Sequence, residues 1–257
     1  WFVKWQSHPR AKDWKKNNMA HVGIVIVNYK DYAQKFLADC RDSLRIQTYP
    51  SEKFQVYIVD NAASEESLSY LKKQFPEAKV LARDDGNYSA AQRLGFETAL
   101  HDGAEFLITV NMDVILDKDW LNELVSAAED HPELGIIQSK VLLFSKDSEP
   151  ERINSVGNKF HYLGFGFTEG YQKIVSEITD NDVKKIDGYA SGCSFITKRE
   201  VIEKIGFHDE EYYMYHDDFE FSWRARLAGF DIGIAPQSIL WHKYEFGRSV
   251  KMVYYME

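Results

Sequence analysis

The chain has 257 residues, of which 44% are hydrophobic and 14% aromatic, enough for one large core, so we expect one globular domain. Its 31 Lys and Arg residues against 40 Asp and Glu residues give a net charge of -9. This balance excludes a general nucleic-acid-binding protein, because that function needs a positive field. An acidic protein can still hold a phosphate-bearing ligand if a divalent cation bridges the phosphates to its carboxylates.

Cysteine content and hydrophobicity give two further expectations. Cys40 and Cys193 are the only cysteines, so we expect two small, buried, free thiols in a reducing compartment. No stretch approaches the roughly 20 apolar residues that a membrane-spanning helix needs, and we expect a cytoplasmic location. Because the chain begins at Trp1 and stops at Glu257 within a further patterned segment, we also expect it to be a piece of a longer protein.

Residues 1–20 form an N-terminal extension that is basic and aromatic in an otherwise acidic chain. Such a segment could rest on an anionic membrane surface, which would place the protein at the inner face of the cell membrane. We favour the alternative, an extra helix packed on the body or a contact with a missing domain. The residues concerned are Trp1, Phe2, Trp5 and Trp14 among Lys4, Arg10, Lys12, Lys15 and Lys16.

Strands and helices are predicted to alternate from residue 21 to residue 142. The first strand, 21–29, is almost continuously apolar and β-branched, which is typical of a strand buried on both faces of a parallel sheet. The alternation predicts right-handed βαβ units and an α/β fold with a mostly parallel central sheet and flanking helices. Further strands are expected at 55–60, 78–82, 105–110 and 135–142, and helices at 31–47, 65–74, 88–101 and 118–130.

The regular alternation ends after residue 143. A mixed, glycine-containing region follows, and then an apolar run that ends at Ile196, a helix at about 217–227 and the segment 239–242. We see no repeat and no linker that would divide the chain. We therefore expect 143–257 to be the second half of the same domain.

Polar residues follow each of the first four strands, where ligands of open α/β sheets bind. The four strand ends read Asn28-Tyr29, Asp60-Asn61, 83–87 and 111–113. Asp60 could accept a hydrogen bond from the N3-H group of a uracil or thymine ring, or could start the turn that follows. The sequence therefore predicts a polar ligand site at this edge of the sheet.

Two segments carry candidate metal ligands. Asn111 and Asp113 lie on the same side of an extended segment and could offer oxygens to Mg²⁺ or Mn²⁺, although both residue types are also common in turns and helix caps. His242 could be a metal ligand or a phosphate contact, or could simply pack beside Trp241. Neither segment is specific alone.

Three acids crowd the start of the predicted helix 217–227. Asp217 and Glu220 share one face, and Asp218 points about 100° away, so one acid can serve chemistry while the others serve structure. The alternative is that acids in a first helical turn simply favour the positive end of the helix dipole.

Taken together, these segments resemble the family 2 glycosyltransferases, and within them the rhamnosyltransferase-like branch of bacterial polysaccharide synthesis. The resemblance covers most of residues 21–247 and consists of seven motifs in the family's order. They are the first strand (25–29), the nucleotide-binding strand (58–62), the diphosphate loop and helix (83–95), the metal-binding motif (111–113), the acceptor-side loop (191–193), the block of the catalytic base (213–224) and the late metal-binding histidine (241–242).

The resemblance implies a GT-A fold and an inverting transfer of a hexosyl or deoxyhexosyl group from a UDP- or dTDP-sugar. The acceptor would be a hydroxyl of a glycan or a lipid-linked saccharide in cell-surface polysaccharide synthesis. Asp218 would be the catalytic base, and Mn²⁺ or Mg²⁺ would bind Asp113, with Asn111 and His242 nearby.

The resemblance also divides the domain into a nucleotide-sugar-binding half, 21–142, and an acceptor-binding and catalytic half, 143–257. The residues expected on the nucleotide-sugar side are Asn28, Tyr29, Asp60, Asp85, Asn87, Arg93 and Asn111. Those expected on the acceptor side are Gly192, Cys193, Asp217 and Glu220.

Several positions depart from the family pattern. Asn111 carries one charge fewer than the Asp found in other members, and Asp217 and Glu220 replace the more usual Glu and Asp. In the diphosphate loop, Asp85, Asn87 and the pair Gln92-Arg93 replace residues that are commonly Asn, Gly and an Asn-containing pair.

The sequence leaves two alternative functions. One is a non-catalytic nucleotide- or carbohydrate-binding module derived from a transferase, which only the departures support. The other is a sugar-phosphate nucleotidyltransferase, which needs a Gly-rich loop after strand one, where residues 28–31 contain no glycine. The sugar, the acceptor, the linkage and the oligomeric state stay open.

Overall fold

The computed structural model describes residues 21–145, 150–178 and 181–243 of the chain. The predicted N-terminal extension, 1–20, lies outside the described residues, so its contact with a membrane or a further domain stays a prediction. Among the residues that are described, no helix is both long and apolar enough to cross a membrane.

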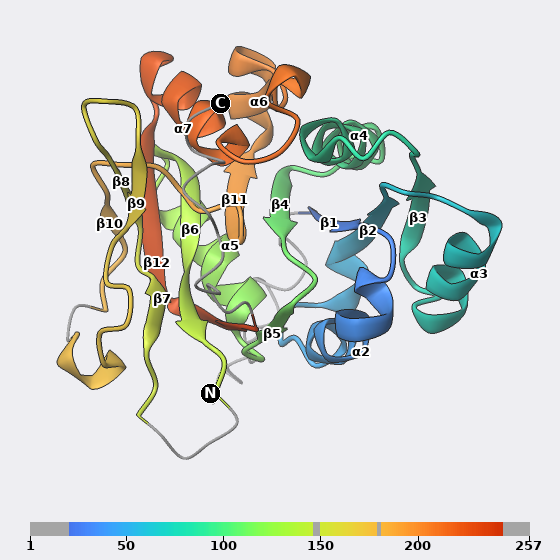
Figure 1. Ribbon diagram of the computed structural model, residues 1–257. Helices are drawn as coiled ribbons and strands as arrows, with labels where there is room; N and C mark the ends of the chain where they lie inside the picture. The colour runs from blue at the N-terminus through green and yellow to red at the C-terminus, as the bar shows by residue number, and fades with distance from the viewer. Residues whose placement is uncertain (1–20, 146–149, 179–180, 244–257) are drawn as a thin grey trace, which may run out of the picture.

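The core of the described structure is one mixed sheet with the strand order β10-β12-β6-β11-β4-β1-β2-β3 (Figure 1). Four strands form its parallel half: β1 (Val22–Asn28), β2 (Phe54–Asp60), β3 (Lys79–Ala82) and β4 (Phe106–Val110). In the other half, β6 (Leu134–Leu143) and β12 (Asp231–His242) are parallel to each other, and β11 (Ser194–Lys198) lies antiparallel between β4 and β6.

Short strands complete the sheet at its margins. β5 (Val114–Leu116) pairs with the end of β12, β7 (Ile153–Ser155) with β6, and β10 (Lys184–Lys185) with β12. β8 (Asn158–Phe160) and β9 (Gly166–Thr168) form a separate hairpin.

Helices cover both faces of the sheet (Figure 1). α2 (Tyr32–Arg45), α3 (Glu65–Gln74) and α5 (Trp120–Asp130) contribute to one hydrophobic core, and α4 (Tyr88–His101), α6 (Arg199–Ile205) and α7 (Asp217–Leu227) to the other. Short 3₁₀ helices lie at Ser51–Lys53, Val175–Glu177 and Glu210–Tyr212.

The composition of β1 follows from this double covering. All seven of its residues are buried. Ile24 and Ile26 belong to the core beneath α2 and α5, whereas Val25 and Val27 belong to the core beneath α4. Because successive side chains point to opposite faces, a strand covered on both sides needs apolar residues at almost every position.

α4 approaches β1 unusually closely because glycines lie at the contact. A Cβ atom on Gly95 would lie 2.3 Å from a methyl carbon of Val25, and one on Gly23 would lie 2.5 Å from the Cβ of Ala99. Larger residues at these two positions would force the helix away from the sheet. This packing fixes α4 along β1, and Tyr88 in the first turn of α4 lies beside Asn111, just after β4.

The predicted fold class is confirmed, and helices 65–74, 88–101 and 217–227 have the bounds expected from the sequence. The prediction did not include α6, β5, the first half of β12 or the small strands β7 to β10. The boundary placed at residue 142 falls at the end of β6, and strands from both halves share the sheet. Cys40 and Cys193 are buried and free, as expected.

Candidate active site

The predicted metal ligands Asp113 and His242 lie together in the structure. Asp113 follows β4, His242 ends β12, and the register pairs His242 with Val114 of β5. Asp113 Oδ1 and His242 Nε2 are 3.3 Å apart, and both side chains are at least nine-tenths buried. Long-range strand pairing therefore joins two residues that are distant in the sequence.

The electrostatics of this pair favour its charged forms. Burial would raise the pKa of Asp113, but hydrogen bonds from His242 and Tyr32 hold it below its ordinary value. Burial would likewise lower the pKa of His242, but the neighbouring Cys193 and Asp113 outweigh it and raise that pKa to about 10. The surroundings thus favour the carboxylate form of Asp113 and the protonated form of His242.

The Asp113–His242 pair fits a divalent cation. Two neighbouring ligands of an octahedral ion at 2.0–2.1 Å lie about 3 Å apart, close to the distance in this structure. His242 Nδ1 lies 3.4 Å from Asn154 Oδ1, a contact of the kind that orients a ligating imidazole. No group of three or more His, Cys, Asp or Glu side chains in the described part of the chain is placed to hold a metal ion. A cation here would therefore need further oxygens from the Asn111 amide, from water or from a bound diphosphate.

The predicted base, Asp218, connects to this pair through the loop 191–193. Its Oδ2 accepts a hydrogen bond from the Gly192 N-H group at 2.8 Å. In the same loop, the carbonyl of Cys193 accepts a hydrogen bond from the Asn111 N-H group at 2.9 Å. Two predicted motifs, the acceptor-side loop and the metal-binding segment, are thereby brought to one place.

The backbone before Asp218 is strained. Tyr213, Tyr215 and His216 have φ angles of 54°, 68° and 58°, in the left-handed region that non-glycine residues seldom adopt. Each such residue costs on the order of 1 kcal/mol and persists only where its surroundings impose it. The turn directs the chain into α7, whose first residues are Asp217 and Asp218.

Asp217 and Asp218 form a close pair of buried carboxyl groups. Burial, and then the negative charge of Asp218, raise the pKa of Asp217 to about 7. Burial also raises the pKa of Asp218, against the hydrogen bonds from Gly192 and Phe219 that stabilise its ionised form. Glu220 differs from both, because its carboxylate accepts hydrogen bonds from Arg224, whose guanidinium also binds the carbonyls of 205 and 207.

At the nucleotide side, Asn28 and Asp60 are fully buried and hydrogen-bonded to each other. Asn28 Nδ2 donates to Asp60 Oδ1 at 2.8 Å, and Asn28 Oδ1 accepts from the Ala33 N-H group at the start of α2. Ser67 Oγ donates to Asp60 Oδ2 at 2.5 Å. Both carboxylate oxygens of Asp60 are engaged and the residue has no exposed surface, so Asp60 organises the ends of β1 and β2. A uracil or thymine ring could hydrogen-bond to Asp60 only by displacing Ser67.

Tyr29 is the exposed member of this group, with 40% of its surface accessible. Its ring lies beside Gly86, where an added Cβ would be 3.5 Å from a Tyr29 ring carbon and 2.8 Å from the Tyr213 hydroxyl. Gly86 has a φ of 73°, so both space and backbone conformation favour glycine there. The rings of Tyr29 and Tyr213 thus flank the loop 83–87.

The predicted diphosphate residues do not converge on Asp113. Asp85 pairs with Arg83, and Asn87 caps α4 by accepting from the Ala90 N-H group while donating to the Glu210 carbonyl. Arg93 pairs with Glu97 and with Glu210 at 3.2 Å. The charged side chains of Asp85 and Arg93, which we expected to contact the diphosphate, are therefore engaged in local ion pairs.

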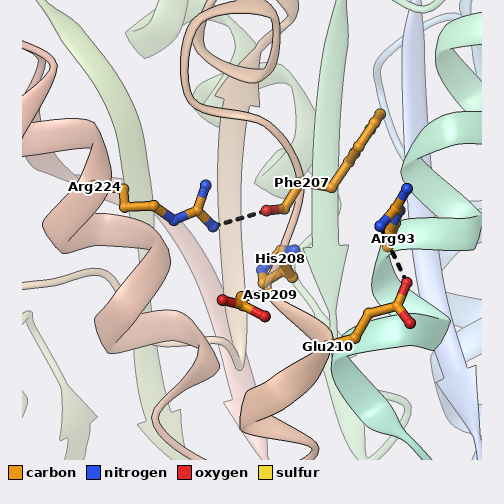
Figure 2. Close-up of a pocket in the computed structure, with 6 residues that line it drawn as sticks. All are labelled: Arg93, Phe207, His208, Asp209, Glu210 and Arg224. Atoms are coloured by element: carbon orange, nitrogen blue, oxygen red, sulfur yellow. Dashed lines mark hydrogen bonds and ion pairs between the residues drawn. The ribbon is translucent and has the colours of Figure 1, made fainter.

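Arg93 instead borders a separate pocket of about 380 Å³ between α4, α7 and the segment 207–210 (Figure 2). His208 lies in this pocket, its ring stacked on Phe221 at 4.4 Å, and burial lowers its pKa to about 3. Arg224 reaches the Phe207 carbonyl at 2.7 Å. Both guanidinium groups are paired with carboxylates, so the pocket offers no free positive charge to an anion.

Several residues at the site were not expected from the sequence. Tyr32 hydrogen-bonds to Asp113, Asn154 contacts His242, and Ser67 binds Asp60. The hydroxyl of Tyr88 lies 3.4 Å from Asn111 Oδ1, and only Tyr88 fell within a motif, the diphosphate loop and helix. The others have common residue types at unremarkable positions, so no local signal identified them.

The parallel βαβ half and the inserted antiparallel strand define an α/β protein of the GT-A fold. The family model described as glycosyl transferase family 2 matches residues 23–206. The chain belongs to glycosyltransferase family 2.

Two curated relatives are similar to this chain. The low-salt glycan biosynthesis hexosyltransferase Agl10 of Haloferax volcanii is 24% identical over 216 residues, which are 82% of this chain and 64% of that protein. The O-antigen biosynthesis protein RfbC of Myxococcus xanthus is 28% identical over 229 residues, which are 85% of this chain and 17% of that protein. The chain thus spans less than two thirds of either relative.

Solved structures share the fold at low sequence identity. A crystal structure of GalNAc-T7 with UDP, GalNAc and Mn²⁺ has a TM-score of 0.70 and 17% identity, and the match covers 89% of this chain and 44% of that one. The S. aureus TarS fragment 1–349 in complex with UDP has a TM-score of 0.59 and 15% identity, covering 88% and 61%. These likenesses support the GT-A fold.

Proposed function

We propose that the protein is a metal-dependent, inverting glycosyltransferase. It transfers a hexosyl or deoxyhexosyl group from a UDP- or dTDP-sugar to a hydroxyl of a glycan or lipid-linked saccharide in cell-surface polysaccharide synthesis. The observation that carries the proposal is the buried pair of Asp113 and His242, 3.3 Å apart and linked through the loop 191–193 to Asp218.

In this proposal Asp113 and His242 hold Mn²⁺ or Mg²⁺, with the Asn111 amide beside them. The chemistry that a divalent cation supplies when bound there is neutralisation of the charge that develops on the leaving diphosphate. His242 must lose its proton to ligate, because only the neutral imidazole offers a lone pair. Ligation by His242 would therefore require proton release from a group whose pKa is raised to about 10.

Asp218 accepts the proton of the attacking acceptor hydroxyl. The N-H groups of Gly192 and Phe219 hold its carboxylate at 2.8 Å each, so the base is oriented before the acceptor binds. A base on the acceptor, with a diphosphate as the leaving group, suits attack from the face opposite the bond that breaks. An inverting glycoside hydrolase would instead need a second carboxylic acid to protonate its leaving group.

On the donor side, Tyr29 offers an exposed aromatic face to the nucleotide base, and the hydrogen bond between Asn28 and Asp60 fixes the strand ends beside it. The peptide groups of the loop 83–87 lie nearby and can contribute to diphosphate binding. The side chains of Asp85, Asn87 and Arg93 are already engaged in local interactions, so we assign them positioning roles around α4.

The alternative of a non-catalytic module is not favoured. A degenerate protein has no need to keep a buried acid-histidine pair and an oriented, buried aspartate. Both are costly to bury without a function, because each places charge away from water.

The test is a transfer assay that follows the glycosylated acceptor and the released nucleoside diphosphate. Purified protein is incubated with Mn²⁺, an acceptor panel of methyl glycosides and each of several UDP- and dTDP-sugars, and NMR reports the anomeric configuration of the new linkage. We expect a product with inverted configuration that Asp218→Asn and Asp113→Asn abolish and that Asp130→Asn, a change at an exposed position on α5, leaves unaffected. Transfer with retained configuration, or undiminished transfer by Asp218→Asn, would contradict the proposal.

A further inference from the structure

A cluster of aromatic rings begins beside Asp218. Phe219, the next residue, has its ring 4.5 Å from that of Phe160 in β8 and 5.3 Å from that of Tyr189. Phe160 in turn meets Trp223, one turn further along α7, edge to face at 5.1 Å. We call Phe160, Phe219 and Trp223 the aromatic ridge.

The aromatic ridge becomes exposed at its far end. Trp223 is 47% accessible although Phe160 fixes the orientation of its ring. Among the described residues, its indole N-H group has no hydrogen-bond partner. The β8–β9 hairpin, whose Phe160 packs against α7 (Figure 1), carries two further exposed aromatic residues at its turn, Tyr162, 88% exposed, and Phe165.

An exposed surface of this kind marks a binding site rather than a core. The contact with Phe160 restricts the Trp223 ring, so little conformational entropy is lost when a ligand stacks on it. A tryptophan combines a large apolar face with a single polar group, the indole N-H donor. That combination matches a pyranose ring, which has an apolar C-H face and hydroxyl groups at its rim.

The position of the aromatic ridge indicates that its ligand is the acceptor rather than the donor. Asp113 and His242 connect to Asp218 through the loop 191–193, whereas the ridge leads away from Asp218 along α7. Trp223 lies five residues beyond Asp218, about 7.5 Å along the helix axis and about 140° around it. Phe219 lies between them on the helix surface and shares the Phe160 ring with Trp223. A saccharide whose reacting hydroxyl meets Asp218, and which follows the helix surface past Phe219, would reach Trp223.

We infer that the aromatic ridge is an acceptor subsite at which a pyranose ring of the acceptor saccharide stacks on Trp223. This inference rests on the proposed function and adds to it a specificity determinant for the acceptor. It makes Trp223 a positioning residue, which touches a sugar ring other than the one that reacts.

Binding and turnover of the variants Trp223→Ala and Trp223→Phe test the inference, and Leu227→Ala is a matched control. Leu227 lies on the same helix, one turn beyond Trp223, and is 74% exposed. Ligand-observed saturation-transfer NMR uses methyl glycosides and disaccharides of glucose, galactose and rhamnose as probes. Calorimetry with UDP and Mn²⁺ checks the donor site of every variant, and thermal melting checks its fold.

We expect saturation to reach the ring protons of at least one probe in the wild-type protein. Trp223→Ala should weaken the binding of that probe by about threefold to tenfold, in keeping with the strength of aromatic stacking. Trp223→Phe should retain most of the affinity. Leu227→Ala should have no effect. In turnover, Trp223→Ala should raise the KM for the acceptor and leave the KM for the donor unchanged.

Three results would overturn the inference while UDP binding, and with it the proposed function, stands. They are equal probe affinity in Trp223→Ala and wild type, the absence of saturation transfer to any probe, and a loss on Trp223→Ala of binding to phosphatidylglycerol vesicles instead of to glycosides. Failure of the wild-type protein to bind UDP with Mn²⁺ would instead contradict the proposed function itself.

Discussion

Replacement of Asp217 by Asn should stabilise the metal-free protein at neutral and alkaline pH. Asp217 is only 7% exposed and lies beside Asp218, so its ionised form is disfavoured in the folded state. Its pKa rises from 3.8 to about 7 on folding. A raised carboxyl pKa means that the folded state binds the proton more tightly than the unfolded state does, so stability decreases as pH rises from about 4 to about 7.

The size of the effect follows from the shift. About three pKa units at about 1.4 kcal/mol each correspond to about 4 kcal/mol of stability that is lost above pH 7. Asn has the same shape, never ionises, and can accept the same backbone hydrogen bonds. The free energy of unfolding of Asp217→Asn should therefore exceed that of the wild type by up to about 4 kcal/mol at pH 8, and the difference should shrink towards zero near pH 4.

Urea denaturation followed by tryptophan fluorescence at pH 5, 6, 7 and 8 measures this difference directly. Asp130→Asn, at an exposed position on α5, is the control and should change stability by less than about 0.5 kcal/mol at every pH. A stability difference that is constant across the pH range, or a wild type more stable than Asp217→Asn at pH 8, would refute the buried-charge reasoning.

Three further predictions concern the base, the packing of α4 and the metal site. Because burial raises the pKa of Asp218 and the base must be ionised, the transfer rate should fall on the acid side with an apparent pKa above that of a free carboxyl group. Asp218→Asn should remove this limb and lower kcat by about 10³-fold, with UDP affinity unchanged in calorimetry. Gly95→Ala should cost about 1–3 kcal/mol in urea denaturation, because the new Cβ would meet Val25 at 2.3 Å. The double variant with Val25→Ala should then be more stable than additivity predicts, and strict additivity would show that the contact is not the cause. Asn154→Ala should weaken Mn²⁺-dependent UDP binding by about tenfold, because the His242 ring loses its orienting contact; unchanged affinity would remove Asn154 from the metal site.

The parallel half of the fold could be predicted because its signals are local. The buried runs of β1, β2 and β4 are continuous and β-branched. The helix α2 between β1 and β2 buries residues at helical spacing, among them Ala33, Leu37 and Leu44. The antiparallel insertion of β11 between β4 and β6 could not be predicted, since the sequence of a five-residue strand contains no information about its direction or its partners. The first half of β12 was missed for the same reason.

The site shows the same division between local and long-range information. The motifs identified Asp113, His242 and Asp218, and the pairing of β12 with β5 brings the first two together. The surroundings of Asp60 and Arg93 depend on contacts with Ser67 and Glu210 that no motif records. The sequence motifs thus predicted which charged residues lie near the candidate site. Which of these charges remain available for a ligand depends on tertiary contacts that the motifs do not contain.

Calorimetric titration of UDP and dTDP into the protein, with and without Mn²⁺, tests the central claim most directly. The account predicts Mn²⁺-dependent binding of at least one nucleotide that Asp113→Asn and His242→Ala each abolish and that Asp130→Asn leaves intact. Nucleotide binding that neither Mn²⁺ nor the two substitutions affect, or no binding of either nucleotide with any divalent cation, would contradict the assignment of the metal and donor site.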